Sequence, residues 1–99
     1  MITTNKIIYN YDNKKDILYI NKNKEHSFGD EILGKGIIRW HSYDKPEIIG
    51  YTLLDFKHNY NINYYDDVRF SEQYTLSLLS KIYNKINNGI EQGYIIINI

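Results

Sequence analysis

The sequence predicts an α+β fold, an antiparallel β-sheet of four to five strands (two hairpins) with one C-terminal helix packed on one face, plus a short C-terminal strand. Three observations indicate it: β-branched and aromatic runs separated by turn residues over residues 6–55, a helical apolar stripe over 67–88, and an isoleucine-rich run over 93–99. A chain of 99 residues can bury one modest core. We therefore expect a single domain, 1–99.

The first hairpin is predicted over residues 6–11 and 16–20. The intervening residues are rich in turn formers, and the side chains of Asp12 and Asn13 can accept hydrogen bonds from backbone amides two residues on. Simple alternation divides the hairpin into two faces, with Ile7, Tyr9, Tyr11, Ile17 and Tyr19 on one and Ile8, Leu18 and Ile20 on the other. Because neither face is wholly polar, a helix is expected on one face, and a tail or a partner on part of the other.

A second hairpin is predicted over residues 36–41 and 47–55. Residues 42–46 form its turn, where Pro46 removes no ladder hydrogen bond. The preceding residues 21–34 are mostly polar, and they predict a loop with at most one short strand.

The helix is predicted over residues 67–88. At 100° per residue an apolar stripe forms that suits packing on a sheet. Asp66 and Asp67 would complement the start of the helix, and Gly89 is suited to the left-handed conformation just beyond its end. The stripe is predicted to contain Val68, Leu76, Leu79, Ile82 and Ile86.

Two groups of apolar residues exceed what this fold needs. Phe70, Tyr74 and Leu78 fall on the back of the predicted helix, where they would be exposed. Residues 94–97 have no alternation, as in a strand covered on both faces. Such a strand must pair with the chain's own sheet or with another chain.

Residues 6–55 resemble a small bacterial family, the domain of unknown function 2283. The resemblance is carried by a Tyr-Asp pair, an Asp before a Leu-Tyr-Ile strand, a turn Asp, and a Gly leading into a strand that ends in Leu-Asp. Here these are Tyr11, Asp12, Asp16, Leu18, Tyr19, Ile20, Asp44, Gly50, Leu53, Leu54 and Asp55. The resemblance implies a pair of hairpins and an accessory, antitoxin-like role, and it carries no catalytic residues.

Composition and spacing exclude several kinds of site. The chain has no cysteine, its formal net charge is zero, and His26, His41 and His58 have no ligand spacing. We therefore expect no metal, no cofactor and no nucleic-acid partner. No apolar run is long enough to span a membrane, and the chain start lacks a signal peptide, which predicts a cytoplasmic protein.

The leading functional hypothesis is a non-enzymatic protein-binding module, such as a small antitoxin, immunity or inhibitor protein that blocks another macromolecule. One alternative is a homodimeric structural or regulatory protein, paired through the C-terminal strand or helix. Another is a small nuclease-like enzyme that uses Arg39 and His41, which alternation places on one strand face. The predicted partner-binding residues are Phe70, Tyr74, Leu78, Tyr64, Tyr65, Asp66 and Asp67.

Overall fold

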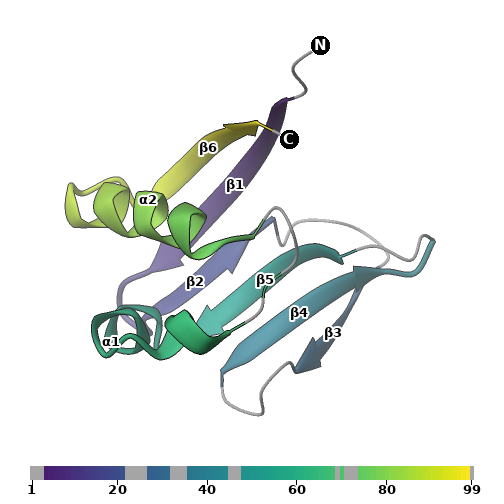
Figure 1. Ribbon diagram of the computed structural model, residues 1–99, viewed down its shortest axis with the longest axis horizontal. Helices are drawn as coiled ribbons and strands as arrows, with labels where there is room; N and C mark the ends of the chain where they lie inside the picture. Colours follow the sequence, from purple (N-terminus) through teal and green to yellow (C-terminus); the bar gives the residue numbers. More distant parts are fainter. Residues whose placement is uncertain are drawn as a thin grey trace.

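The computed structural model describes residues 4–21, 27–31, 36–44, 48–68, 70 and 74–98. Its centre is an antiparallel sheet in the order β3-β4-β5-β2-β1-β6 (Figure 1). The strands are β1 (Thr4–Asp12), β2 (Ile17–Ile20), β3 (Ser27–Glu31), β4 (Ile37–Ser42), β5 (Ile48–Leu54) and β6 (Gln92–Asn98). The predicted α+β class is confirmed, with six strands rather than four or five. The C-terminal strand pairs with β1 of the same chain.

Three helical segments follow β5: α1 (Phe56–Asn61), a 3₁₀ helix η1 (Tyr64–Asp67) and α2 (Leu76–Asn87). The predicted helix start at Asp67 is wrong, because the chain is extended at Val68 and Thr75 caps α2 by accepting a hydrogen bond from Leu78 N at 3.2 Å. Asp66 and Asp67, which the sequence placed at the start of the helix, lie in η1 instead. Gly89 has the predicted left-handed backbone, with φ of 87°.

The β1–β2 hairpin has a register that sequence alternation missed. Tyr11 pairs with Leu18 and Tyr9 with Ile20, so Leu18 and Ile20 lie on the face of Tyr9 and Tyr11. The predicted faces of β2 are therefore exchanged. The cause is the even-numbered turn of residues 13–16, since a shift of one residue moves every side chain of a strand to the other face.

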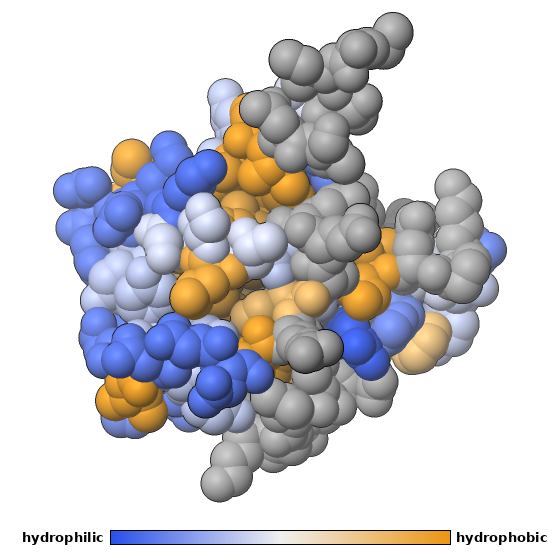
Figure 2. Space-filling view, in the orientation of Figure 1, coloured by the Kyte–Doolittle hydropathy of each residue, from blue (hydrophilic) through white to orange (hydrophobic). Residues whose placement is uncertain are grey.

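The helices α1 and α2 cover the same face of the sheet and lie in front of it in Figure 1. In Figure 2, which shows this face, hydrophilic side chains cover the outer sides of the helices and hydrophobic ones are visible between them. Tyr74 and Leu78 are buried here, at 5% and 2% exposure, and Phe70 packs against the core. The prediction of exposure is wrong for Tyr74 and Leu78, and Phe70 is half-buried. The core comprises Ile7, Tyr9, Tyr11, Leu18, Ile20, Ile37, Tyr51, Leu53, Phe56, Tyr65, Tyr74, Leu78, Leu79, Ile82, Ile86 and Ile95.

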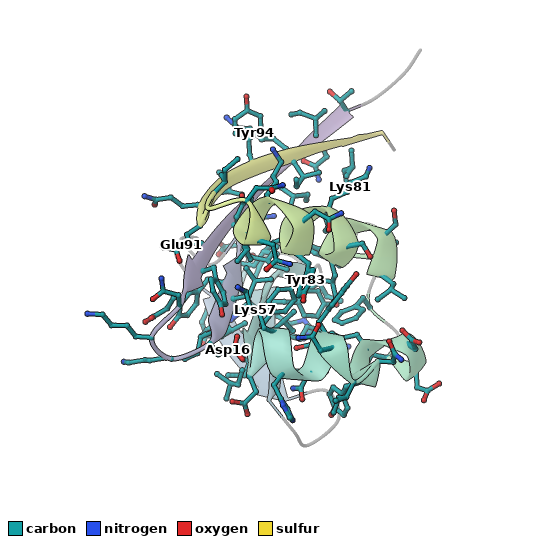
Figure 3. The ribbon with its side chains drawn as sticks, turned by 90° about the vertical axis from the view of Figure 1, so that its left-hand side faces the viewer. Asp16, Lys57, Lys81, Tyr83, Glu91 and Tyr94 are labelled. Carbon is teal, nitrogen blue, oxygen red and sulfur yellow. The ribbon has the colours of Figure 1, made fainter. Side chains whose placement is uncertain are left out.

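Asp16 joins the first hairpin to α1. Its carboxylate accepts hydrogen bonds from the Tyr11 hydroxyl at 2.7 Å and from the amides of Lys57 and His58 at 2.9 and 3.3 Å. Figure 3 shows Asp16 beside Lys57, where the hairpin turn reaches the helix. The predicted turn role of Asp12 is confirmed by hydrogen bonds from Lys14 N and Lys15 N to its carboxylate. Asp16 adds an N-terminal cap supplied from a distant part of the chain.

Gly50 in β5 lies very close to the backbone of the adjacent strand, β2. A Cβ built at Gly50 would collide with the carbonyl oxygen of Ile20. Only glycine fits this position without a shift of backbone.

The predicted turn at Lys45 and Pro46 lies outside the described residues. Within the described chain, no helix is long and apolar enough to cross a membrane.

Candidate protein-binding surface

The face of the sheet opposite the helices carries large apolar side chains at its β6 end. Register pairs Ile8 with Tyr94 and Lys6 with Ile96, so these four side chains share one face. Ile8, Tyr94 and Ile96 are 44%, 53% and 51% exposed. We call these four residues the open-face patch. Exposed apolar side chains that gather on one surface are typical of an interaction site.

Lys6 is held against this patch. Its ammonium group lies 4.5 Å from the centre of the Tyr94 ring, a cation–π contact. The aliphatic stem of a lysine can cover neighbouring apolar surface while its charge stays in water. The patch therefore combines apolar area with one positive charge.

A shallow groove of about 780 Å³ runs beside the patch along β2, β1 and β6. Asn21 fixes one wall: its backbone N–H donates to Ile8 O, its side-chain oxygen accepts from Ile8 N at 2.8 Å, and its amide donates to the Tyr74 hydroxyl. Gly93 pairs with Tyr9, whose side chain points to the helix face and whose hydroxyl donates to Ile90 O at 2.8 Å. The lining residues are Lys6, Ile8, Tyr9, Asn10, Tyr19, Asn21, Gln92, Gly93 and Tyr94.

The outer edge of β6 directs backbone groups away from the sheet. Tyr11 N donates to Glu91 O at 2.7 Å, and hydrogen-bonded pairs in an antiparallel ladder recur at every second residue. The backbone groups of Gly93 and Ile95 therefore point toward β1. Those of Tyr94 and Ile96 point outward, where no strand of the described chain lies.

The helix side of β6 has a second, smaller groove, of about 480 Å³. It lies between α2 and β6 and is lined by Lys81, Asn84, Lys85, Tyr94, Ile95 and Ile96. In Figure 3, Tyr94 and Lys81 lie on opposite sides of the β6 ribbon. The edge of β6 is thus flanked by a lysine on one face of the sheet and by two lysines on the other.

The chain matches no protein-family model, no curated protein and no solved structure. The resemblance to the family of domain of unknown function 2283 thus remains a prediction. The geometry of the surface itself must carry any functional conclusion.

The structure separates the predicted partner-binding residues into two groups. Tyr74 and Leu78 pack in the core, and the half-buried Phe70 packs against it, with Tyr51 contacting both aromatic rings edge-on. Burial inside the chain removes the reason for assigning Tyr74 and Leu78 to an interface. The others belong to η1, where Tyr65 is buried, Tyr64 is half-buried, and Asp66 and Asp67 are exposed.

Tyr65 is an interior residue with a polar end. Its hydroxyl is buried, and burial raises its pKa well above the usual value for tyrosine. Its ring stacks on Phe56 at 6.0 Å between centroids. These contacts give Tyr65 a role in packing α1 and η1 against the sheet.

Arg39 and His41 lie on the same strand face, as predicted. Arg39 Nε donates to His41 Nε2 at 3.0 Å, and the His41 ring stacks on Phe28 with centroids 5.2 Å apart. Among the described residues, no three His, Asp or Glu side chains gather as metal ligands.

Sequence reasoning identified β6 as a strand in need of a partner but not the residues exposed on it. Lys6, Ile8 and Ile96 become neighbours only once the β1–β6 register is fixed. One signal was available in the sequence: residues 92–98 contain no charge and no proline, the usual protection of an edge strand.

Proposed function

We propose that this protein is a protein-binding module that accepts an extended segment of another polypeptide along β6. The observation that carries the proposal is the coincidence of the open-face patch with a strand edge that no strand of the described residues pairs. Strand addition uses backbone hydrogen bonds for affinity and alternate side chains for specificity. The outward backbone groups of Tyr94 and Ile96 would supply the hydrogen bonds, and the side chains of the open-face patch would supply the specificity.

Apolar exposure alone would not favour strand addition over other modes of contact. The edge supports it, because β6 has seven residues and lacks the devices that normally prevent pairing. Charged side chains and prolines are common means of blocking such an edge. Neither a charge nor a proline does so over residues 92–98.

The mode of action that we propose is steric, as in a small antitoxin, immunity or inhibitor protein. Such a protein acts by covering a surface or completing a sheet of its target, without chemistry of its own. The protein encoded by the adjacent reading frame is the first natural target to test. We expect the Ile96→Pro variant, which blocks the edge of β6, to lose that complex.

The test uses hydrogen exchange by NMR on the full chain, with a blocked peptide of alternating valine and threonine as the strand probe. In the free protein, the Tyr94 and Ile96 amides should exchange faster than the inward Ile95 amide. A saturating amount of peptide should slow the two outward amides by at least about tenfold, since a bound strand protects them.

The matched variant is Ile96→Pro. Proline removes an outward N–H that makes no bond to β1, so the fold should be retained, whereas Ile95→Pro would remove a ladder bond and serves as the damaging comparison. Ile96→Pro should abolish peptide binding. Unchanged exchange of the outward amides, or equal binding by wild type and a folded Ile96→Pro, would overturn the proposal.

A further inference from the structure

We infer that the segment accepted by β6 is acidic. The inference rests on the proposed function, and it names the chemistry of the partner. It is carried by the lysines on both sides of the strand edge: Lys6 on the open face, and Lys81 and Lys85 beside the groove on the helix face.

The charged side chains that line the two grooves beside β6 are all lysines. From Tyr74 to the end of the chain the only charged side chains are Lys81, Lys85 and Glu91. Glu91 precedes β6, at the hairpin end, and its carboxylate accepts a hydrogen bond from the Asn13 side chain. The middle of β6 therefore faces lysines alone, although the formal net charge of the whole chain is zero.

A strand paired to β6 would present its side chains alternately to the two faces of the sheet. Side chains on the open face would approach Lys6 and Tyr94. Side chains on the helix face would approach the groove of Lys81 and Lys85. Carboxylates on either set of positions would lie near an ammonium group that lines the adjoining groove, and complementary charge at a contact favours the matching partner.

The same charges oppose pairing with a second copy. A two-fold axis through the middle of β6 would place Tyr94 opposite Ile96 of the other copy, a favourable apolar pair. It would also bring Lys6, Lys81 and Lys85 of both copies to one shared edge, with no carboxylate on β6 to meet them. Like charges at a contact disfavour the wrong partner. An acidic foreign segment fits the edge better than a second copy.

The experiment compares two blocked peptides, one of alternating valine and glutamate and one of alternating valine and lysine, by titration calorimetry at about 0.15 M salt. The wild-type chain should bind the glutamate peptide at least about tenfold more tightly, which is 1.4 kcal/mol. Because the lysines are exposed, the preference should shrink as salt is raised. The variant Lys81→Glu/Lys85→Glu should reverse the preference.

The matched control is Lys14→Glu/Lys15→Glu, which makes the same change of charge at the exposed turn of the β1–β2 hairpin. Its preference for the glutamate peptide should stay within about twofold of wild type, because neither lysine lines the grooves beside β6. Equal reversal by both double variants would show a nonspecific charge effect and overturn the inference.

The remaining outcomes separate the inference from the proposed function. Equal affinity for both peptides, lost in Ile96→Pro, would overturn the acidic preference and leave strand addition intact. Failure to bind either peptide would overturn both. A dimer at micromolar concentration by light scattering, converted to a monomer by Ile96→Pro, would identify a second copy as the occupant and overturn the inference.

Discussion

Removal of the Asp16 carboxylate should destabilise the protein through two losses at once. The Tyr11 hydroxyl, on a side chain that is only 6% exposed, would lose its acceptor. The first turn of α1 would lose the hydrogen bonds that its Lys57 and His58 amides donate to the carboxylate. Asp16→Gly isolates these losses, because Asp16 has φ of 55° and glycine tolerates that conformation without strain.

The expected cost follows from the same contacts. An orphaned buried hydroxyl costs about 1–3 kcal/mol, and loss of a helix cap costs about 0.5–2 kcal/mol. The sum, about 1.5–5 kcal/mol, is a large part of the about 5–15 kcal/mol that stabilises a domain. Urea unfolding should report it directly. In a domain of this size, each kcal/mol also lowers the thermal midpoint by about 4–8 °C.

Two comparisons make the measurement specific. Asp16→Asn keeps the oxygen that accepts from Tyr11 and Lys57, so it should cost less than Asp16→Gly. Asp12→Ala removes a carboxylate from the same turn, where it accepts only exposed amides, and should cost less than about 1 kcal/mol. Equal urea midpoints for Asp16→Gly and Asp12→Ala would refute the role of Asp16 as the link between the hairpin and α1.

Three further outcomes are expected from the core. Leu79→Ala should cost about 2–5 kcal/mol in urea unfolding because Leu79 is buried, whereas Leu76→Ala, at a position 40% exposed, should change stability by no more than about 0.5 kcal/mol. Gly50→Ala should cost at least about 1–3 kcal/mol, since its Cβ would meet backbone, and a wild-type midpoint would contradict that contact. Burial, with a smaller contribution from the Asp16 hydrogen bond, raises the pKa of Tyr11 above the unfolded value of about 10, so the folded chain keeps a proton that the unfolded chain loses. Stability should therefore fall as pH rises above about 10, and Tyr11→Phe should make that fall smaller.

The sequence was a sufficient guide to the strands but not to their register. Runs of β-branched residues separated by turn formers predicted both hairpins and the C-terminal strand. Whether Leu18 shares a face with Tyr11 depends on the number of residues in the turn, and alternation within each strand leaves that number open. β3, at the opposite edge from β6, lies in a region of polar residues with little apolar pattern to mark it.

The helical region shows a different limit. The helical spacing of apolar residues extends back to Val68 and so predicted one long helix over residues 67–88. In the structure the chain is extended at Val68, and α2 begins after Thr75. The break leaves Tyr74 before α2, where it is buried. Within α2 the buried face is rotated from the predicted stripe, so that Leu78 is buried and Leu76 is 40% exposed. α1 was missed for two reasons. Its six residues are too few to show a helical period, and its cap comes from Asp16, which precedes Lys57 by 41 residues.

The helical region also bears on which surface of the protein exposes apolar side chains. The sequence offered two candidates, the back of the helix and the C-terminal strand, and burial of Tyr74 and Leu78 removes the first. Residues 94–97 have the composition of a strand covered on both faces, but the helices cover only one face of the sheet. Ile95 is buried under that cover, while Tyr94 and Ile96 remain about half exposed. A segment added to β6 would cover their edges and continue the sheet, and the surrounding lysines favour a segment that brings carboxylates with it.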